Sequence, residues 1–237
     1  MPARTLAVAV ALLQVLAGPR TQRVLFIGNS LTAANNLPAM VAAIARQRGE
    51  AIECETIAFP DYSLDDHLDR GDAVRAIARG GWSEVVLQQG PSALPESRVL
   101  LRAAVRKFDT EVRRAGARTA LYMVWPSQAR RGDFERVSQS YAMAAADVHA
   151  LLLPAGDAWR AAWRKDSGLA LYGNDGFHPS PMGSYLAALV IYQGLTGQSP
   201  VGLPPSLRSP AGEFPAMAFP PDVAALLQQA ATRVGSR

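Results

Sequence analysis

Short hydrophobic runs of strand length alternate along the chain with longer segments whose apolar residues recur every three or four positions. The predicted strands are residues 24–27, 51–57, 84–88, 119–125 and 150–153. The predicted helices are residues 36–49, 63–79, 96–115, 133–148, 181–195 and 223–234, with a brief one near Trp159. Five strand-then-helix steps in succession predict an α/β fold, with a doubly wound, five-stranded, mostly parallel sheet and helices on both faces.

Local signals set several of the helix starts. Asn36 is predicted to cap a helix with Pro38 in its first turn. Ser63 and Asp66 have the spacing of a capping box. Asp157 is predicted to cap the brief helix that carries Trp159 and Trp163.

The first strand ends at Gly28 and is followed by Asn29-Ser30-Leu31-Thr32, with the next helix expected only from about Asn36. Gly28 can adopt backbone angles closed to other residues, so the chain can turn and leave Ser30 pointing out of the sheet edge. This pattern indicates a nucleophile displayed at the end of a strand. The alternative is an ordinary strand-to-loop turn, since Gly-Asn-Ser is also common turn chemistry.

Asp175 and His178 are separated by two residues, one of them Gly176, in a loop before the helix that begins at Pro181. A turn there would bring the carboxylate onto the imidazole, fix its tautomer and leave the other ring nitrogen for a serine. The alternative is a turn that carries a surface histidine.

Ligands of open α/β sheets bind beyond the carboxyl ends of the strands, so functional residues should follow the strands directly. Ser30 follows the first predicted strand, Asp61 the second, Gln89 the third, and Trp125 ends the fourth. The sequence therefore predicts one site at this edge.

Composition narrows the classes of function. The 237 residues carry a net charge of +4, but the arginines are scattered and no basic stripe with interleaved aromatic residues occurs, which argues against nucleic-acid binding. Cys54, the one cysteine, has no partner for an internal disulfide or a metal site. No glycine-rich phosphate-binding motif occurs, and we predict no cofactor. We also predict no metal site. One cluster has the residue types of a metal site, but three of its carboxylates lie in the first turns of a predicted helix, where negative charge is favoured: Asp61, Asp65, Asp66, His67, Asp69 and Asp72.

Residues 1–17 have the features of a signal peptide: Arg4, then an apolar stretch too short to span a bilayer, then small residues before Gly18. They predict export to the periplasm or the medium, and a cytoplasmic protein if they are instead a helix or strand packed on the domain. Residues 18–237 are predicted to form one domain with a Pro-rich strap, 197–221, and a C-terminal helix, 222–235. We predict no stable membrane insertion, and the oligomeric state stays open.

The order Ser, Asp, His is similar to that of α/β-hydrolases, but Gly28-Asn29-Ser30-Leu31-Thr32 lacks the second glycine of their G-x-S-x-G turn. The chain instead resembles the SGNH, or GDSL-type, hydrolase superfamily over residues 23–196. Gly28-Asn29-Ser30-Leu31 resembles its nucleophile block, and Asp175-Gly176-Phe177-His178 matches its D-x-x-H block. The resemblance implies a flavodoxin-like sheet, with Ser30 as nucleophile, His178 as base and then acid, and Asp175 as the orienting carboxylate.

The middle blocks depart from the family pattern. Asp61 stands where the family has an oxyanion-hole glycine, and Gly90-Pro91-Ser92-Ala93 replaces a block that carries a donating asparagine. The resemblance then implies an oxyanion hole of the Ser30 and Asp61 backbone N–H groups and the Gln89 side-chain amide. Gln88 and Ser92 are substitutes for Gln89. The candidates for substrate binding are Asn29, Gln88, Ser92 and Trp125.

Together these features predict a serine esterase for short-chain, most simply acetyl, esters, with O-acetyl groups on a carbohydrate as the favoured substrate. The alternatives are a non-catalytic glycan-binding module on the same fold and an O-acyltransferase. His67 could line the cleft, while His149 is interpreted as structural. Trp125, Trp159 and Trp163 could stack on a sugar but are more typical of a core.

Overall fold

A computed structural model describes residues 21–234 and contains a five-stranded parallel sheet in the order β2-β1-β3-β4-β5. The strands are β1 (Gln22–Gly28), β2 (Ile52–Ala58), β3 (Glu84–Leu87), β4 (Arg118–Tyr122) and β5 (Leu151–Leu153). This order and direction confirm the predicted doubly wound α/β fold.

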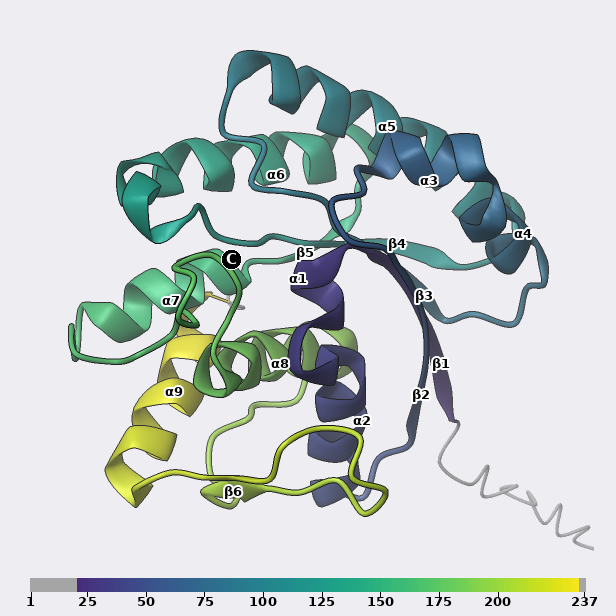
Figure 1. Ribbon diagram of the computed structural model, residues 1–237. Coiled ribbons are helices and arrows are strands. Elements are labelled where there is room, and N and C mark those ends of the chain that lie inside the picture. The colour runs from purple at the N-terminus through teal and green to yellow at the C-terminus, as the bar shows by residue number, and fades with distance from the viewer. Residues whose placement is uncertain (1–20, 235–237) are drawn as a thin grey trace, which may run out of the picture.

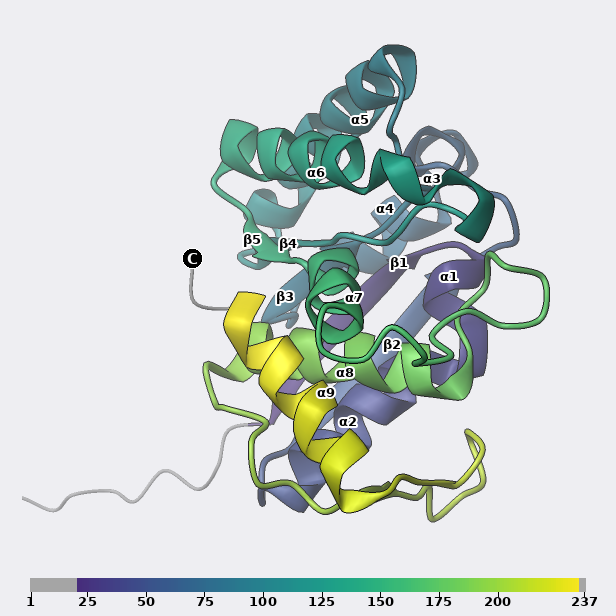
Figure 2. The same ribbon diagram turned by 90° about the vertical axis from the view of Figure 1, so that its left-hand side faces the viewer.

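Helices cover both faces of the sheet (Figures 1 and 2). On one face lie α3 (Leu64–Arg70), α4 (Asp72–Ala78), α5 (Pro95–Arg114) and α6 (Phe134–Val148). The other face is covered by α2 (Leu37–Gln47), α7 (Ala155–Trp163), α8 (Pro181–Thr196) and α9 (Pro221–Val234). Between these layers, Val24 to Ile27 of β1 form an apolar run that is fully buried, as expected of a strand covered on both faces.

The structure corrects three predicted helix boundaries. A short helix, α1 (Ser30–Ala33), begins at Ser30 itself and is followed by a 3-10 turn at 34–36, whereas we expected no helix before about Asn36. The helix expected over 63–79 is two helices, because Gly71 takes a left-handed φ of 80° that an α-helix cannot continue through. Asp157 lies in the first turn of α7 and does not cap it; Pro154 precedes that helix.

The Pro-rich segment 197–221 runs along the α2, α8 and α9 side of the molecule (Figure 1). Within it, β6 (Ser206–Leu207) and β7 (Met217–Ala218) form a small antiparallel pair. The predicted signal peptide, residues 1–17, lies outside the described residues. Among residues 21–234, no helix is both long and apolar enough to cross a membrane.

Candidate active site

Ser30 is the first residue of α1, and one residue, Asn29, separates it from the end of β1. Asn29 caps this helix, because its side-chain oxygen accepts a hydrogen bond from the Leu31 N–H at 3.1 Å. The first N–H groups of a helix have no partner within it. The Ser30 N–H is therefore left available beside its own hydroxyl, which is the arrangement that an oxyanion-binding nucleophile needs.

Gly28 is required for space and not for a left-handed backbone. Its φ is not positive, unlike that of nine other glycines among the described residues. A Cβ at this position would lie 2.4 Å from both Gln88 Oε1 and Thr32 Oγ1. The prediction that Gly28 takes backbone angles closed to other residues is wrong; the glycine instead allows Gln88 to approach the nucleophile loop.

The loop that carries Asp175 and His178 is a compact turn before α8. Gly173 N–H donates to the His178 carbonyl at 2.7 Å, and Gly176 N–H donates to the Gly173 carbonyl at 3.1 Å. Gly176 has a φ of 68°, which a side chain at this position would make costly. The turn therefore folds the Asp175 carboxylate back towards the His178 ring, as the spacing predicts.

Ser30, His178 and Asp175 form a continuous hydrogen-bonded chain. Ser30 Oγ lies 2.9 Å from His178 Nε2, and His178 Nδ1 lies 2.5 Å from Asp175 Oδ2. A carboxylate only accepts, so Nδ1 carries the proton and Nε2 is free to take one from the serine. The geometry is that of a nucleophile, a general base and an orienting acid.

Asp175 is held as a carboxylate. Its Oδ2 accepts from the His178 ring, and its Oδ1 accepts from the Phe177 and His178 N–H groups, both at 2.9 Å. These hydrogen bonds, the one from the His178 ring foremost, lower the pKa of Asp175 to about 2. The carboxylate therefore stays charged beside the imidazole whenever the histidine accepts a proton.

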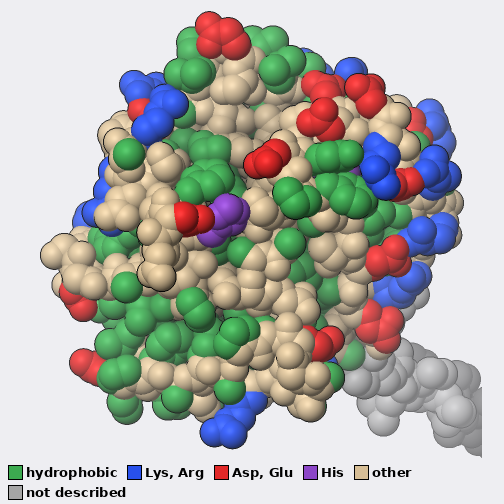
Figure 3. Space-filling model, in the orientation of Figure 1, with side chains coloured by type: hydrophobic (Ala, Val, Ile, Leu, Met, Phe, Trp, Pro, Cys, Tyr) green, Lys and Arg blue, Asp and Glu red, His purple; other side chains and the backbone are tan. Residues whose placement is uncertain are grey.

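The acid and base lie at the surface, with side-chain exposures of 52% for Asp175 and 40% for His178. Figure 3 shows a histidine beside an acidic side chain near the middle of one face, with hydrophobic side chains next to it. An ester in solution can therefore reach this face without an opening step.

Asn35 ties the two halves of the site together, and its role has no clear signal in the sequence. Its side-chain amide donates to the Pro179 carbonyl at 3.1 Å and to Ser184 Oγ at 2.9 Å. Its own φ of 53° is in the left-handed region, where asparagine is tolerated better than most residues. The nucleophile loop is thereby fixed to the segment that follows His178.

Two of the predicted oxyanion donors, Asp61 and Gln89, each have an N–H group without a hydrogen-bond partner among the described residues. Asp61 sits in a left-handed turn with φ 61°, and its N–H has no protein partner among the described residues. Gln89 is more constrained: its Oε1 accepts from the Leu64 N–H at 3.2 Å, and its Nε2 donates to Ser92 Oγ at 2.9 Å. One N–H of Gln89 remains without a partner in residues 21–234, so its role stays a prediction.

Three predicted substrate-binding residues are buried, and their side chains make hydrogen bonds within the protein. The side-chain oxygen of Asn29 accepts a hydrogen bond from the Leu31 N–H, and its side-chain nitrogen donates to the Tyr62 carbonyl. Gln88 is 1% exposed and makes all its hydrogen bonds internally. Trp125 is fully buried, stacks on Trp159 at 3.6 Å and donates to the Phe177 carbonyl at 3.0 Å. Gln88 and Trp125 present no free polar or aromatic face, so these two assignments are wrong. Asn29 Nδ2 makes one hydrogen bond and keeps a second N–H, so contact of Asn29 with substrate stays a prediction.

His67 differs from expectation, whereas the prediction for Ser92 is not tested. His67 does not line a cleft, because it is fully buried. Ser92 is buried with φ 54° and lines a cavity of about 260 Å³ together with Phe177 and the loop at Pro126. Phe177 precedes His178 in the chain, and their ring centroids lie 5.3 Å apart, but neither Ser30 nor His178 lines this cavity. Contact of Ser92 with substrate therefore stays a prediction.

The acidic cluster is engaged in capping and ion pairs. Asp66 accepts from Ser63 in the predicted capping box, and Asp65 pairs with Lys107. Asp72 pairs with Arg70. No group of three or more histidine, cysteine or acidic side chains is arranged to hold a metal ion within residues 21–234.

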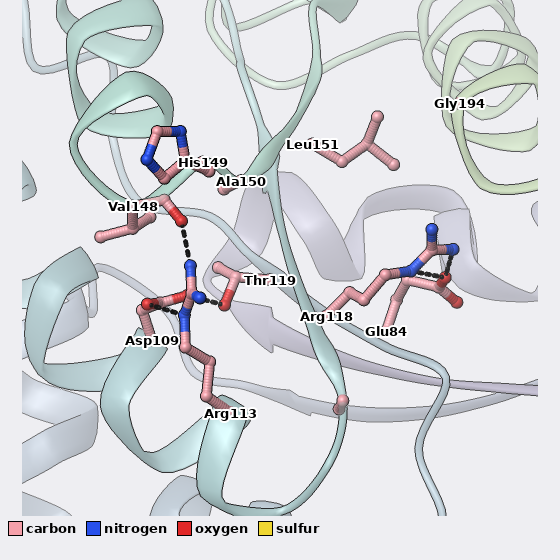
Figure 4. A pocket seen from close by; sticks show the side chains of 11 residues that line it. Glu84, Asp109, Arg113, Arg118, Thr119, Val148, His149, Ala150, Leu151 and Gly194 are labelled. Atoms are coloured by element: carbon pink, nitrogen blue, oxygen red, sulfur yellow. Dashed lines mark hydrogen bonds and ion pairs between the residues drawn. The ribbon is translucent and has the colours of Figure 1, made fainter.

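A second cavity, of about 450 Å³, lies at the amino ends of β3 and β4, away from the carboxyl ends that carry Ser30 (Figure 4). Glu84 and Arg118 begin these strands and form an ion pair, and Asp109 pairs with Arg113. His149, also on its lining, follows α6 in a left-handed backbone with φ 55°. Both carboxylates on the lining of this cavity, Glu84 and Asp109, are paired with arginines. Neither is therefore free to act as a base for a nucleophile.

The chain is similar to a solved structure assigned to the SGNH hydrolases from Slackia heliotrinireducens, with 31% identity over 74% of this chain and 100% of that one and a TM-score of 0.62. This similarity shows that the chain belongs to the SGNH hydrolase family. The predicted class, an SGNH-type hydrolase, is confirmed at this level.

Other solved structures share the fold at lower identity. A DUF4886 family protein from Bacteroides uniformis has 18% identity over 91% of this chain and 95% of its own, with a TM-score of 0.75. An acetylxylan esterase from Geobacillus stearothermophilus has 14% identity over 75% and 95%, with a TM-score of 0.58. No protein-family model and no curated protein matches the chain.

Proposed function

We propose that this SGNH hydrolase is a serine esterase that cleaves short-chain esters, acetyl esters first, through an acyl-enzyme on Ser30. The observation that carries the proposal is the unbroken hydrogen-bonded chain from Ser30 Oγ to His178 to Asp175. Ser30 and His178 lie 148 residues apart in the sequence. The fold brings them together at the edge of the sheet where α/β enzymes bind their ligands.

In the proposed reaction, Ser30 Oγ attacks the ester carbonyl carbon while His178 Nε2 takes the hydroxyl proton. The carbonyl oxygen becomes an oxyanion held by the Ser30 and Asp61 N–H groups, with the remaining Gln89 N–H as a third donor. His178 then gives its proton to the departing alcohol oxygen, which leaves an acyl group on Ser30. Water, deprotonated by the same imidazole, attacks that acyl group and releases the acid.

Neither Ser30 nor His178 lines the cavity of about 260 Å³ that Ser92 and Phe177 line, so the size of the acyl group is proposed from similarity in fold and not from this cavity. The similarity in fold to an acetylxylan esterase adds support for an O-acetyl group on a carbohydrate as the substrate.

The test is hydrolysis of 4-nitrophenyl acetate and 4-nitrophenyl octanoate by the protein, by Ser30→Ala and by Ser209→Ala. Ser209 lies in the Pro-rich strap, where it bonds Glu213, so its variant is a matched control. We expect acetyl turnover above octanoyl turnover, retained in Ser209→Ala and lost in Ser30→Ala. A preference for octanoate would contradict the short-chain assignment, and equal background rates for all three proteins would contradict the esterase.

A companion measurement separates the two alternatives. Transfer of acetyl groups to an added sugar acceptor, in place of release as acetate, would identify an O-acyltransferase. Binding of an acetylated glycan with no turnover in any protein would identify a glycan-binding module. We expect free acetate as the product.

A further inference from the structure

The peptide group between Gly28 and Asn29 is held on both sides by buried side chains. Its carbonyl oxygen lies 2.7 Å from His67 Nε2, and its N–H donates to Gln88 Oε1 at 2.9 Å. His67 comes from α3, and Gln88 follows β3. This peptide group directly precedes Ser30, so the two side chains act on the backbone that aims the nucleophile.

His67 makes one strong polar contact and leaves its second ring nitrogen without one. A carbonyl only accepts, so Nε2 carries the proton and Nδ1 is an acceptor. Nδ1 is buried and has no hydrogen-bond partner in residues 21–234. The ring is enclosed by the aromatic rings of Phe59 and Tyr62, with centroids at 5.8 and 5.2 Å.

This environment would suit an apolar ring better if packing were the only task, because an unpaired buried nitrogen destabilises the fold. What an apolar ring could not provide is the hydrogen bond to the Gly28 carbonyl. Burial also lowers the pKa of His67, which keeps the ring neutral and the donor in place.

Gln88 holds the other side of the peptide group between Gly28 and Asn29. Besides the Asn29 N–H, its Oε1 accepts from the Thr32 hydroxyl at 2.7 Å. Its Nε2 donates to Asn29 Oδ1 at 3.0 Å and to the Gln89 carbonyl at 2.6 Å. Both hydrogens and the oxygen of this amide are engaged, so Gln88 stabilises the nucleophile loop and has no N–H left for an oxyanion.

We infer that His67 and Gln88 are positioning residues that clamp the Gly28–Asn29 peptide and thereby set the direction of the Ser30 N–H and hydroxyl. The inference rests on the proposed function of Ser30 as the nucleophile. Small misplacements of a reacting group can cost orders of magnitude in rate. The clamp should therefore affect the chemical step more than the binding of substrate.

The experiment compares His67→Phe, which keeps an aromatic ring and removes the donor, with His67→Gln, which keeps a side-chain N–H. Rates are divided by the number of sites that a fluorophosphonate labels, so that misfolded protein does not count. In His67→Phe we expect kcat to fall roughly 10- to 100-fold with KM changed by less than about threefold. His67→Gln should recover a large part of that loss.

Affinity for a trifluoromethyl ketone, which forms an oxyanion on the serine, should fall in parallel with kcat/KM. Gln228→Leu is the matched control, since Gln228 is also buried and bonds backbone at Gly202 and Leu203, in another part of the fold. It should lose stability while keeping kcat per labelled site. A kcat per labelled site in His67→Phe within about twofold of the unmodified protein would overturn the clamp.

Hydrogen exchange at the Asn29 and Ser30 amides tests the clamp without any turnover. Exchange should be faster in His67→Phe than in the unmodified protein, and intermediate in His67→Gln. Unchanged exchange in His67→Phe would overturn the inference. Failure of the esterase proposal has a different signature, namely an unmodified protein with no turnover and no labelling of Ser30.

Discussion

The nucleophile block and the acid–base loop meet at one edge of the sheet but are held in different ways. Around Ser30 the backbone is buried and bonded by side chains from other elements, namely His67 and Gln88. Around Asp175 and His178 the side chains are half exposed, and the turn is kept in shape by its own main-chain hydrogen bonds.

This difference matches the tasks of the two halves. The nucleophile and the oxyanion donors must keep fixed directions, because preorganised dipoles are what stabilise the transition state. The imidazole must gain and lose a charge, and contact with solvent makes that charge less costly. We therefore expect the nucleophile side to tolerate little change in packing and the acid–base side to tolerate more.

The largest effect is expected for the base itself. His178→Ala removes the one proton acceptor that is hydrogen-bonded to the Ser30 hydroxyl within residues 21–234. We expect kcat to fall by about 10⁴-fold or more, and the double variant with Ser30→Ala to be no slower than either single variant. Steady-state rates on 4-nitrophenyl acetate measure this, and additive losses would show that the two residues do not work as a unit.

Asp175→Asn should lower kcat less than His178→Ala does, by roughly 10- to 100-fold, because water can partly replace an exposed carboxylate beside the imidazole. The pKa of about 2 keeps Asp175 ionised at every pH used for assay, so the fall in activity towards acid does not come from this group. A pH–rate profile for both proteins checks this. A loss as large as that of His178→Ala would contradict the tolerance expected of the exposed half.

Gly28→Ala tests the buried half. The new methyl group would meet Gln88 Oε1 and Thr32 Oγ1 at 2.4 Å, so the loop must shift. We expect a loss of about 1–3 kcal/mol in the free energy of unfolding and a fall of roughly 10²-fold in kcat. Gly132→Ala is the control, since a Cβ there would meet nothing within 4 Å. Equal activity in the two variants would show that the space beside Gly28 is not needed.

The chemistry-bearing residues could be predicted from the sequence because they are local signals. The strand-end position of Ser30 and the close spacing of Asp175 and His178 each depend on a few neighbouring residues, and the alternating strands and helices predict the sheet. The supports could not be predicted in this way. His67, Gln88 and Asn35 act through contacts between residues 39 to 149 positions apart, which no local pattern reveals.

The helix that begins at Ser30 cannot be predicted from the sequence for a related reason. Its four residues are too few for an apolar period, and its cap, Asn29, equally suits a turn. The assignment of Trp125 to the site is wrong because it rests on the position of this residue at the end of a predicted strand, whereas packing against Trp159 buries it. Position along the strand places a residue at the edge but does not say which way its side chain points.

The smallest effect concerns the pH dependence of stability. Burial lowers the pKa of His67 in the folded protein, although the nearby Asp66 and Asp72 oppose the shift and Arg70 adds to it. The unfolded chain therefore takes up a proton more readily, and stability should fall as pH drops below about 6.5. His67→Gln should show a flatter decline, by about 1 kcal/mol between pH 7.5 and 5. Urea unfolding at the two pH values measures it, and parallel declines would contradict a buried neutral ring.

The central claim is that Ser30 is the nucleophile and that His178 activates it. Labelling of the protein with a fluorophosphonate, followed by mass analysis of its peptides, tests this most directly. We predict one label per chain, on the peptide that contains Ser30, absent in Ser30→Ala and strongly slowed in His178→Ala. A label on any other residue, or ester hydrolysis that persists in Ser30→Ala, would contradict the account.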